Sequence, residues 1–128
     1  MNGNYIVDTN VIIKLLNSDE RAEELFDKAD NIYISSIVAG ELFYGAYNST
    51  RKQENIDIFT DFLSQYDIVD INASIANIYG DIKTQLKRDG HNIPENDLWI
   101  AATAIHSNYT LITFDAHFSN INGLNIQN

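Results

Sequence analysis

The amino-acid sequence predicts an α/β protein, a three-layer α/β/α sandwich with a central, mainly parallel sheet covered by helices on both faces. Short apolar runs typical of buried strands alternate along the chain with segments whose apolar residues recur at helical spacing. Such alternation indicates a parallel sheet, because parallel strands are usually connected by helices. One proline, six glycines and a 45% hydrophobic composition over 128 residues predict one domain, residues 1–128, without an internal linker.

The first strand is predicted at residues 5–8, where the apolar run Tyr5-Ile6-Val7 ends at Asp8. Apolar residues between positions 11 and 16 then follow helical spacing, so the strand leads directly into a helix. A second amphipathic helix is expected over residues 22–29. Its acids crowd the first turns, where they suit the helix dipole and form a solvated face.

The second strand is predicted at residues 32–34. Ser35 or Ser36 is placed to cap the next helix, whose apolar residues run from 38 to 46. A further apolar stripe at 56–63 predicts another helix.

Ile68-Val69 is the third predicted strand, and Asp70 at its end is expected to cap the following helix. The apolar stripe of that helix covers residues 75–86. Gly90 and Pro94 bracket the loop by which the chain leaves it.

The last third of the chain begins with a helix over residues 97–107, which we expect Asn96 to cap. Its many alanines suit close packing against a sheet. Residues 109–113 are the fourth strand, 115–118 a single helical turn and 124–126 a short last strand.

Four carboxylates are placed to meet at one edge of this sheet. Asp8 and Asp115 follow strands, whereas Asp97 lies in the first turn of a helix and Glu41 about one turn inside another. In open parallel sheets, ligands bind beyond the carboxyl ends of the strands, where the strand order reverses. We therefore expect the four side chains to point into one crevice.

This convergence predicts a divalent metal site. Carboxylates within a few ångströms of one another repel, so some must take up protons unless a cation neutralises them. None of the four acids has a lysine or arginine within four residues. Oxygen ligands favour Mg²⁺ or Mn²⁺. Each acid alone could instead be a helix start or a turn residue, so the prediction depends on the joint pattern.

The charge balance alone argues against a nucleic-acid partner. Eighteen acids and eight bases give a net charge of −10, which repels phosphates at long range. A bound dication would reverse the sign locally. The bases are also clustered, since Arg51 and Lys52 adjoin while Lys83, Lys87 and Arg88 share one helical segment.

Other sequence features exclude several classes of site and location. The chain has no cysteine, which excludes disulfides and thiolate metal sites. His91, His106 and His117 lack the spacing of a zinc site, and we expect them to be surface or core residues. Residues 1–4 lack the basic region of a signal peptide, and no apolar window is long enough to span a membrane. We expect a cytoplasmic protein.

The segments around the four acids also form recognisable motifs. They are Asp8-Thr9-Asn10-Val11, Glu41-Leu42 with Gly45, Asn96-Asp97 followed by Ile100-Ala101-Ala102, and Thr113-Phe114-Asp115 with His117-Phe118. In this order and spacing they resemble the PIN domain, specifically the VapC-type ribonuclease toxins of bacterial and archaeal toxin–antitoxin pairs. The resemblance spans nearly the whole chain.

The resemblance implies a PIN-like fold and a Mg²⁺- or Mn²⁺-dependent endoribonuclease that cleaves RNA. It also implies a small VapB-like antitoxin and a homodimer. By this resemblance Asp8, Glu41, Asp97 and Asp115 are the catalytic and metal-binding residues. Asp8 and Asp97 are the firmest ligands, and the position of Asp115 varies most in the family.

A mechanism can be expected from these roles. A metal held by Asp8 and Asp97 would lower the pKa of a bound water and polarise a phosphate oxygen, leaving 5′-phosphate and 3′-hydroxyl ends. Glu41 could orient or deprotonate the water, and Asp115 could hold a second ion or bind through water. One metal or two is left open.

Neighbouring side chains are expected to support this site. The short hydrogen-bonding side chains of Thr9, Asn10 and Thr113 lie beside the acids and could orient them. Lys83, Lys87 and Arg88 could bind RNA phosphates outside the cleft.

Two other functional classes would require different sequence features. A non-catalytic PIN-like module that binds RNA or protein would lose at least one of the four acids. A phosphotransfer domain would need an acid pair with a nearby lysine, whereas residue 10 is Asn and no such lysine follows the fourth strand.

The aromatic residues have structural roles in this interpretation. Phe43, Tyr44 and Tyr47 could line an antitoxin groove, but core or rim packing is expected. Trp99 is expected to pack into the domain rather than read a base.

Overall fold

The computed structural model describes residues 3–128. Met1 and Asn2, which belong to the segment used to argue against a signal peptide, lie outside the described residues. Within residues 3–128, five strands form one sheet in the order β3-β2-β1-β4-β5, and every adjacent pair is parallel. The predicted parallel α/β sheet is confirmed.

The predicted elements occur in the predicted order. The strands are β1 (Asn4–Val7), β2 (Asn31–Ser35), β3 (Asp67–Val69), β4 (Thr110–Ile112) and β5 (Ile126–Gln127). The helices are α1 (Thr9–Leu16), α2 (Glu20–Lys28), α3 (Ser36–Tyr47), α4 (Lys52–Leu63), α5 (Ala73–Arg88), α6 (Glu95–Ser107) and a short 3₁₀ helix (Ala116–Asn120).

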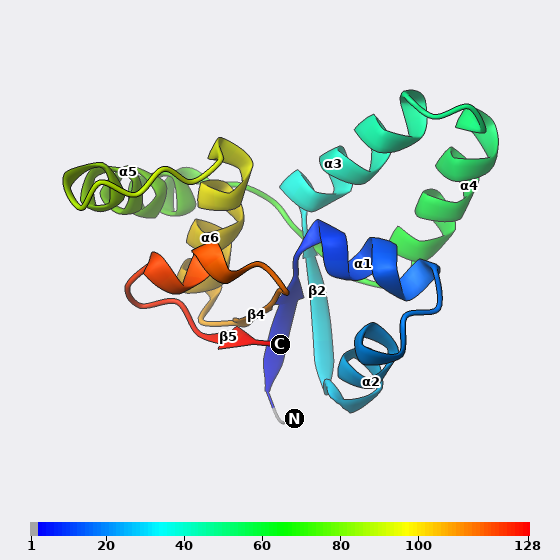
Figure 1. Ribbon diagram of the computed structural model, residues 1–128, viewed down its shortest axis with the longest axis horizontal. Coiled ribbons are helices and arrows are strands. Elements are labelled where there is room, and N and C mark those ends of the chain that lie inside the picture. Colours follow the sequence, from blue (N-terminus) through cyan, green and yellow to red (C-terminus); the bar gives the residue numbers. More distant parts are fainter. Residues whose placement is uncertain (1–2) are drawn as a thin grey trace.

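The strand order explains how the helices are distributed. From β1 the chain steps to β2 and β3 in one direction, and then crosses back to β4 on the other side of β1. Because parallel crossovers are right-handed, steps in opposite directions place their helices on opposite faces of the sheet. Figure 1 shows α1 to α4 on one side of β1 and β2, and α5 and α6 on the other. The strand order therefore reverses between β1 and β4.

The core lies between the sheet and these helices. Ile6, Val7, Leu111 and Ile112 of the two central strands are fully buried. The alanines of α6 are also fully buried, which lets this helix pack closely on the sheet as predicted. The three-layer packing thus fixes the ends of β1 and β4 beside the start of α6.

Two predicted helix caps are wrong. Asn72, not Asp70, caps α5: its side chain accepts a hydrogen bond from the Ile75 amide at 2.9 Å, because the helix begins only at Ala73. Helix α6 begins at Glu95, so Asn96 lies inside its first turn and does not cap it. Pro94 precedes this helix, with a φ of −54° that already suits helix entry.

Trp99 packs into the domain, as predicted. Its ring stacks on Tyr79 of α5 with centroids 3.9 Å apart and an interplanar angle of 2°. In the part of the chain that the structure describes, no helix combines the length and apolar character needed to cross a membrane.

Candidate metal centre

Asp8 connects the ends of the two central strands. Its backbone amide donates to the carbonyl of Ile112 at 2.9 Å, and its Oδ1 accepts from the amide of Thr9 at 2.8 Å, which caps α1. Its Oδ2 accepts from the Thr113 hydroxyl at 2.9 Å. These contacts hold the carboxylate between β1 and the residue that follows β4.

The environment of Asp8 is unfavourable for a negative charge. The residue is 5% exposed, and this burial, together with the Asp97 and Glu41 carboxylates, raises its pKa to about 6. The hydrogen bond from Thr113 opposes that rise. A cation in the site would relieve the same electrostatic cost.

Glu41 lies in the second turn of α3, where the helix comes close to the start of α1. Its Oε1 accepts from the Thr9 hydroxyl at 2.7 Å, and its Oε2 accepts from the side-chain Nδ2 of Asn96 at 3.5 Å. Residues from the first turns of α1 and α6 therefore orient this carboxylate.

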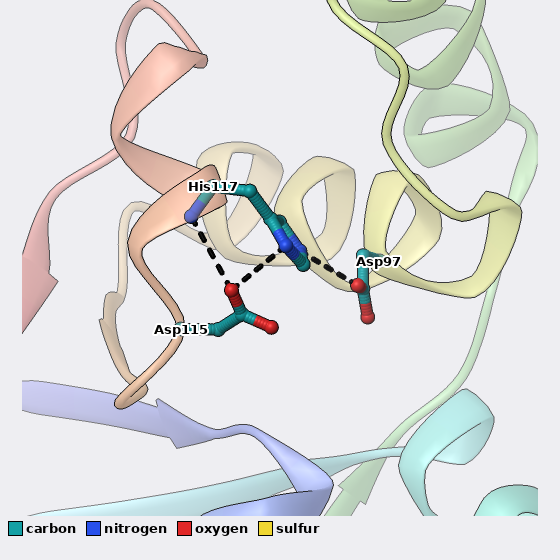
Figure 2. A group of neighbouring side chains, drawn as sticks. All are labelled: Asp97, Asp115 and His117. Carbon is teal, nitrogen blue, oxygen red and sulfur yellow. Dashed lines mark hydrogen bonds and ion pairs between the residues drawn. The ribbon is translucent and has the colours of Figure 1, made fainter.

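Three side chains form a cluster (Figure 2): Asp97 in the first turn of α6, Asp115 just before the 3₁₀ helix, and His117 within that helix. His117 Nε2 lies 2.8 Å from Asp97 Oδ2, and His117 Nδ1 lies 2.8 Å from Asp115 Oδ1. One potential ligand atom from each residue falls within 4.8 Å of the other two. Burial raises the pKa of Asp97, and the nearby Glu41 and Asp115 add to this, while the hydrogen bond with His117 opposes it.

The four predicted acids line one pocket of about 450 Å³. Its walls include Asp8, Thr9, Asn10, Glu41, Asp97 and Asp115, and the start of α6. This acid pocket lies at the carboxyl ends of β1 and β4, where the strand order reverses, as expected for a parallel sheet. Among the described residues that line it, none is a lysine or arginine. The donor set therefore fits a divalent cation held by oxygen ligands.

The predicted supporting residues differ in what they contact. Thr9 and Thr113 each donate a hydroxyl hydrogen bond to one of the acids. Asn10 is exposed and lines the acid pocket.

The three bases predicted to bind RNA phosphates, Lys83, Lys87 and Arg88, lie on the last turns of α5, beside the acid pocket. Lys83 forms an ion pair with Glu95, a residue that lines the acid pocket. Lys87 lines a neighbouring pocket together with Lys83, Glu95 and His91. Arg88 is exposed at the end of the same helix.

Sequence reasoning missed two residues of the site. His117 was expected to be an ordinary surface or core residue, yet it contacts two of the acids. Its position two residues after the strand-end Asp115 was the available signal. Glu95 lines the acid pocket and pairs with Lys83. It was overlooked because the predicted helix starts at residue 97, whereas α6 begins directly after Pro94. His91 and His106 are exposed, as predicted.

A family model described as the PIN domain matches residues 5–124 of the chain. The chain belongs to the PIN domain family. Within that family, this PIN domain groups with the VapC proteins. It is 39% identical over 113 residues to Ribonuclease VapC2 of Rickettsia felis, covering 85% of this chain and 84% of that protein. It is 29% identical over 123 residues to the tRNA(fMet)-specific endonuclease VapC of Shigella flexneri, covering 94% and 93%.

Solved structures agree with this grouping. The PIN domain superposes on a chain of VapBC2 from Rickettsia felis bound to a promoter DNA fragment with a TM-score of 0.90, at 33% identity, covering 98% of each chain. A chain of DNA-bound VapBC from Salmonella typhimurium gives a TM-score of 0.89 at 29% identity, covering 97% of this chain and 96% of that one. The PIN fold is therefore shown over nearly the whole chain.

Proposed function

We propose that this PIN domain is a metal-dependent endoribonuclease and the toxin of a toxin–antitoxin pair. The observation that carries the proposal is the acid pocket, in which four carboxylates from distant parts of the sequence meet at the switch point of the sheet. Its relatives support the reaction class, since they are named ribonucleases and endonucleases.

Asp8, Glu41, Asp97 and Asp115 would hold Mg²⁺ or Mn²⁺ in the acid pocket. When bound, such an ion supplies Lewis-acid activation of a water molecule and of a phosphate oxygen. Glu41, held by Thr9 and Asn96, is placed to orient or deprotonate the attacking water. Attack in line with the 3′ oxygen leaves 5′-phosphate and 3′-hydroxyl ends.

The RNA strand would be held beside the acid pocket by the bases of α5. The pocket lined by Lys83, Lys87 and His91 has a volume of about 370 Å³ and shares Glu95 with the acid pocket. Because Lys83 is already paired with Glu95, we assign the contact with a phosphate next to the scissile bond chiefly to Lys87. Arg88, the exposed last residue of the same helix, would add a further phosphate contact.

The antitoxin would occupy an apolar groove that ends at the acid pocket. The groove has a volume of about 350 Å³ and is lined by Ile13, Leu16, Leu42, Ile58, Phe59 and Glu41. Ile13, Leu16 and Ile58 are 37%, 38% and 42% exposed, which is unusual for large aliphatic residues in one groove. The solved relatives are VapBC toxin–antitoxin complexes. A segment in this groove reaches Glu41 and could block access to the metal.

A homodimer is part of the same proposal, by resemblance to the family. Sedimentation equilibrium of the purified chain tests it: a mass of twice 14.5 kDa is expected, and a concentration-independent monomer would contradict it.

Replacement of the central acids tests the reaction itself. Asp8→Asn and Asp97→Asn should each lower RNA cleavage in Mg²⁺ or Mn²⁺ by about a hundredfold or more, because the metal loses a charged ligand. Asp81→Asn, on the exposed side of α5, is the matched control. Undiminished cleavage by the folded Asp97→Asn protein would exclude this mechanism, whereas RNA binding without any cleavage by the wild-type chain would favour a non-catalytic module.

A further inference from the structure

We propose that His117 supplies a nitrogen ligand to the metal through Nε2, so that the ion is bound by an imidazole as well as by carboxylates. The inference rests on the proposed metal-dependent function and specifies the ligand set of that site. It assigns a direct role to a side chain that the four-acid pattern leaves out.

The imidazole ring is held in a fixed orientation by Asp115. Its Nδ1 lies 2.8 Å from Asp115 Oδ1, and the same carboxylate oxygen accepts from the His117 backbone amide at 3.3 Å. The Asp115 amide in turn donates to the hydroxyl of Thr113 at 3.0 Å. Metal-binding histidines commonly donate one ring nitrogen to a carboxylate in this way and bind the ion through the other nitrogen.

The other ring nitrogen of His117 faces the carboxylate of Asp97. His117 Nε2 lies 2.8 Å from Asp97 Oδ2 (Figure 2). Adjacent ligands of an octahedral ion with bonds of about 2.1 Å lie about 3.0 Å apart. The two atoms are therefore already spaced as neighbouring ligands. When both bind one ion, the ion replaces the hydrogen bond that joins them, and the proton of that bond is released to solvent.

The accessibility of these side chains suits an ion that enters from solvent. The His117 side chain is 28% exposed and that of Asp97 17% exposed, so both are anchored in the fold but reachable. Phe118, the next residue, is fully buried and fixes the 3₁₀ helix that carries the histidine. The ring is thus presented by a rigid segment rather than by a free loop.

A nitrogen ligand changes which ions the site prefers. Mg²⁺ is bound mainly by oxygen, whereas first-row transition ions accept imidazole readily. His117 should therefore favour Mn²⁺ over Mg²⁺ at this site. Loss of the ring should affect Mn²⁺ binding more than Mg²⁺ binding.

Pulsed electron paramagnetic resonance of the full chain with bound Mn²⁺ tests the ligand directly, without an activity assay. Echo modulation from a coordinated ¹⁴N nucleus is expected in the wild type and in the control His106→Gln, which alters an exposed histidine at the opposite end of α6 from Asp97. It should be absent in His117→Gln. Wild-type Mn²⁺ spectra without nitrogen modulation, or modulation that persists in His117→Gln, would overturn the proposal.

Metal affinities provide a second readout. His117→Gln should weaken Mn²⁺ binding by about tenfold or more, and Mg²⁺ binding, measured by competition, by a smaller factor. An equal loss for both ions would contradict a nitrogen ligand. Saturable Mn²⁺ binding without nitrogen modulation removes this inference alone, whereas a wild-type chain that binds no Mn²⁺ removes the proposed function as well.

Discussion

The hydroxyl of Thr113 donates a hydrogen bond to Oδ2 of Asp8 at 2.9 Å, across 105 residues of sequence. Both side chains are buried, and the same hydroxyl oxygen accepts from the amide of Asp115 at 3.0 Å. One threonine thus connects the first and the last acid of the site. It also lowers the cost of keeping a carboxylate in the core.

Thr113→Val tests this connection. The substitution preserves the shape but leaves Asp8 with one hydrogen bond fewer, so the free energy of unfolding at pH 8 should fall by about 1–3 kcal/mol. Thr103→Val is the matched control, because Thr103 is equally buried but bonds only to the Trp99 carbonyl of its own helix. Urea unfolding of both variants in a chelator measures the difference, and equal losses would contradict a special role for Thr113.

The pKa of Asp8 predicts how the stability of the metal-free protein depends on pH. The carboxyl has a pKa of about 6 in the folded state and 3.8 as its ordinary value, so the folded state binds the proton more tightly. Stability should therefore decrease as the pH rises from about 4 to about 6 and stay lowered above that, by roughly 3 kcal/mol in total.

Asp8→Asn removes this pH-dependent contribution. The metal-free variant should be more stable than the wild type at pH 8, by up to about 3 kcal/mol, and the difference should vanish near pH 4. Asparagine can still cap α1, so the cap is not lost with the charge. Urea unfolding across this pH range measures the difference; a destabilised variant at pH 8 would show that Asp8 is mainly structural.

Metal binding should reverse the order of stability. At a Mn²⁺ concentration a hundred times the dissociation constant, the wild type gains about 2.7 kcal/mol. Asp8→Asn should gain much less at the same concentration. Thermal unfolding with and without Mn²⁺ measures both values, and equal gains for the two proteins would place the ion elsewhere.

The pocket lined by Lys83, Lys87 and His91 predicts a change in the salt dependence of RNA binding. In an Asp97→Asn background that does not cleave, Lys87→Gln should reduce the slope of log K against log salt by about 0.7, as expected for one lost phosphate contact with a single strand. Lys28→Gln, which removes an exposed lysine paired with Glu24 on α2, serves as control. An unchanged slope in the Lys87 variant would exclude that contact.

The groove between α1, α3 and α4 predicts the effect of a charge on antitoxin binding. Ile58→Glu places a carboxylate among apolar groove residues, so co-purification with the cognate antitoxin should be lost while RNA cleavage persists. Ile68→Glu, at a similarly exposed isoleucine on β3, is the control. Retention of the antitoxin by Ile58→Glu would move the interface to another surface.

The apolar periodicity of the sequence was sufficient to predict the sheet, its helices and the meeting of the four acids. Burial of β1 and β4 follows directly from their apolar runs, and the position of Asp8 follows from the end of β1. The caps at Asn72 and Pro94 could not be predicted, because the helix starts depend on where the packed chain leaves the sheet. The position of His117 two residues after Asp115 indicated their local contact, but its contact with Asp97, 20 residues away on α6, depends on the packed fold.

The most direct test of the central claim is a crystal of this PIN domain soaked in Mn²⁺, measured for anomalous scattering. We expect a strong anomalous peak in the acid pocket, within bonding distance of carboxylate oxygens of both Asp8 and Asp97. An empty pocket at saturating Mn²⁺, or a peak only at other acids such as those of α2, would contradict it.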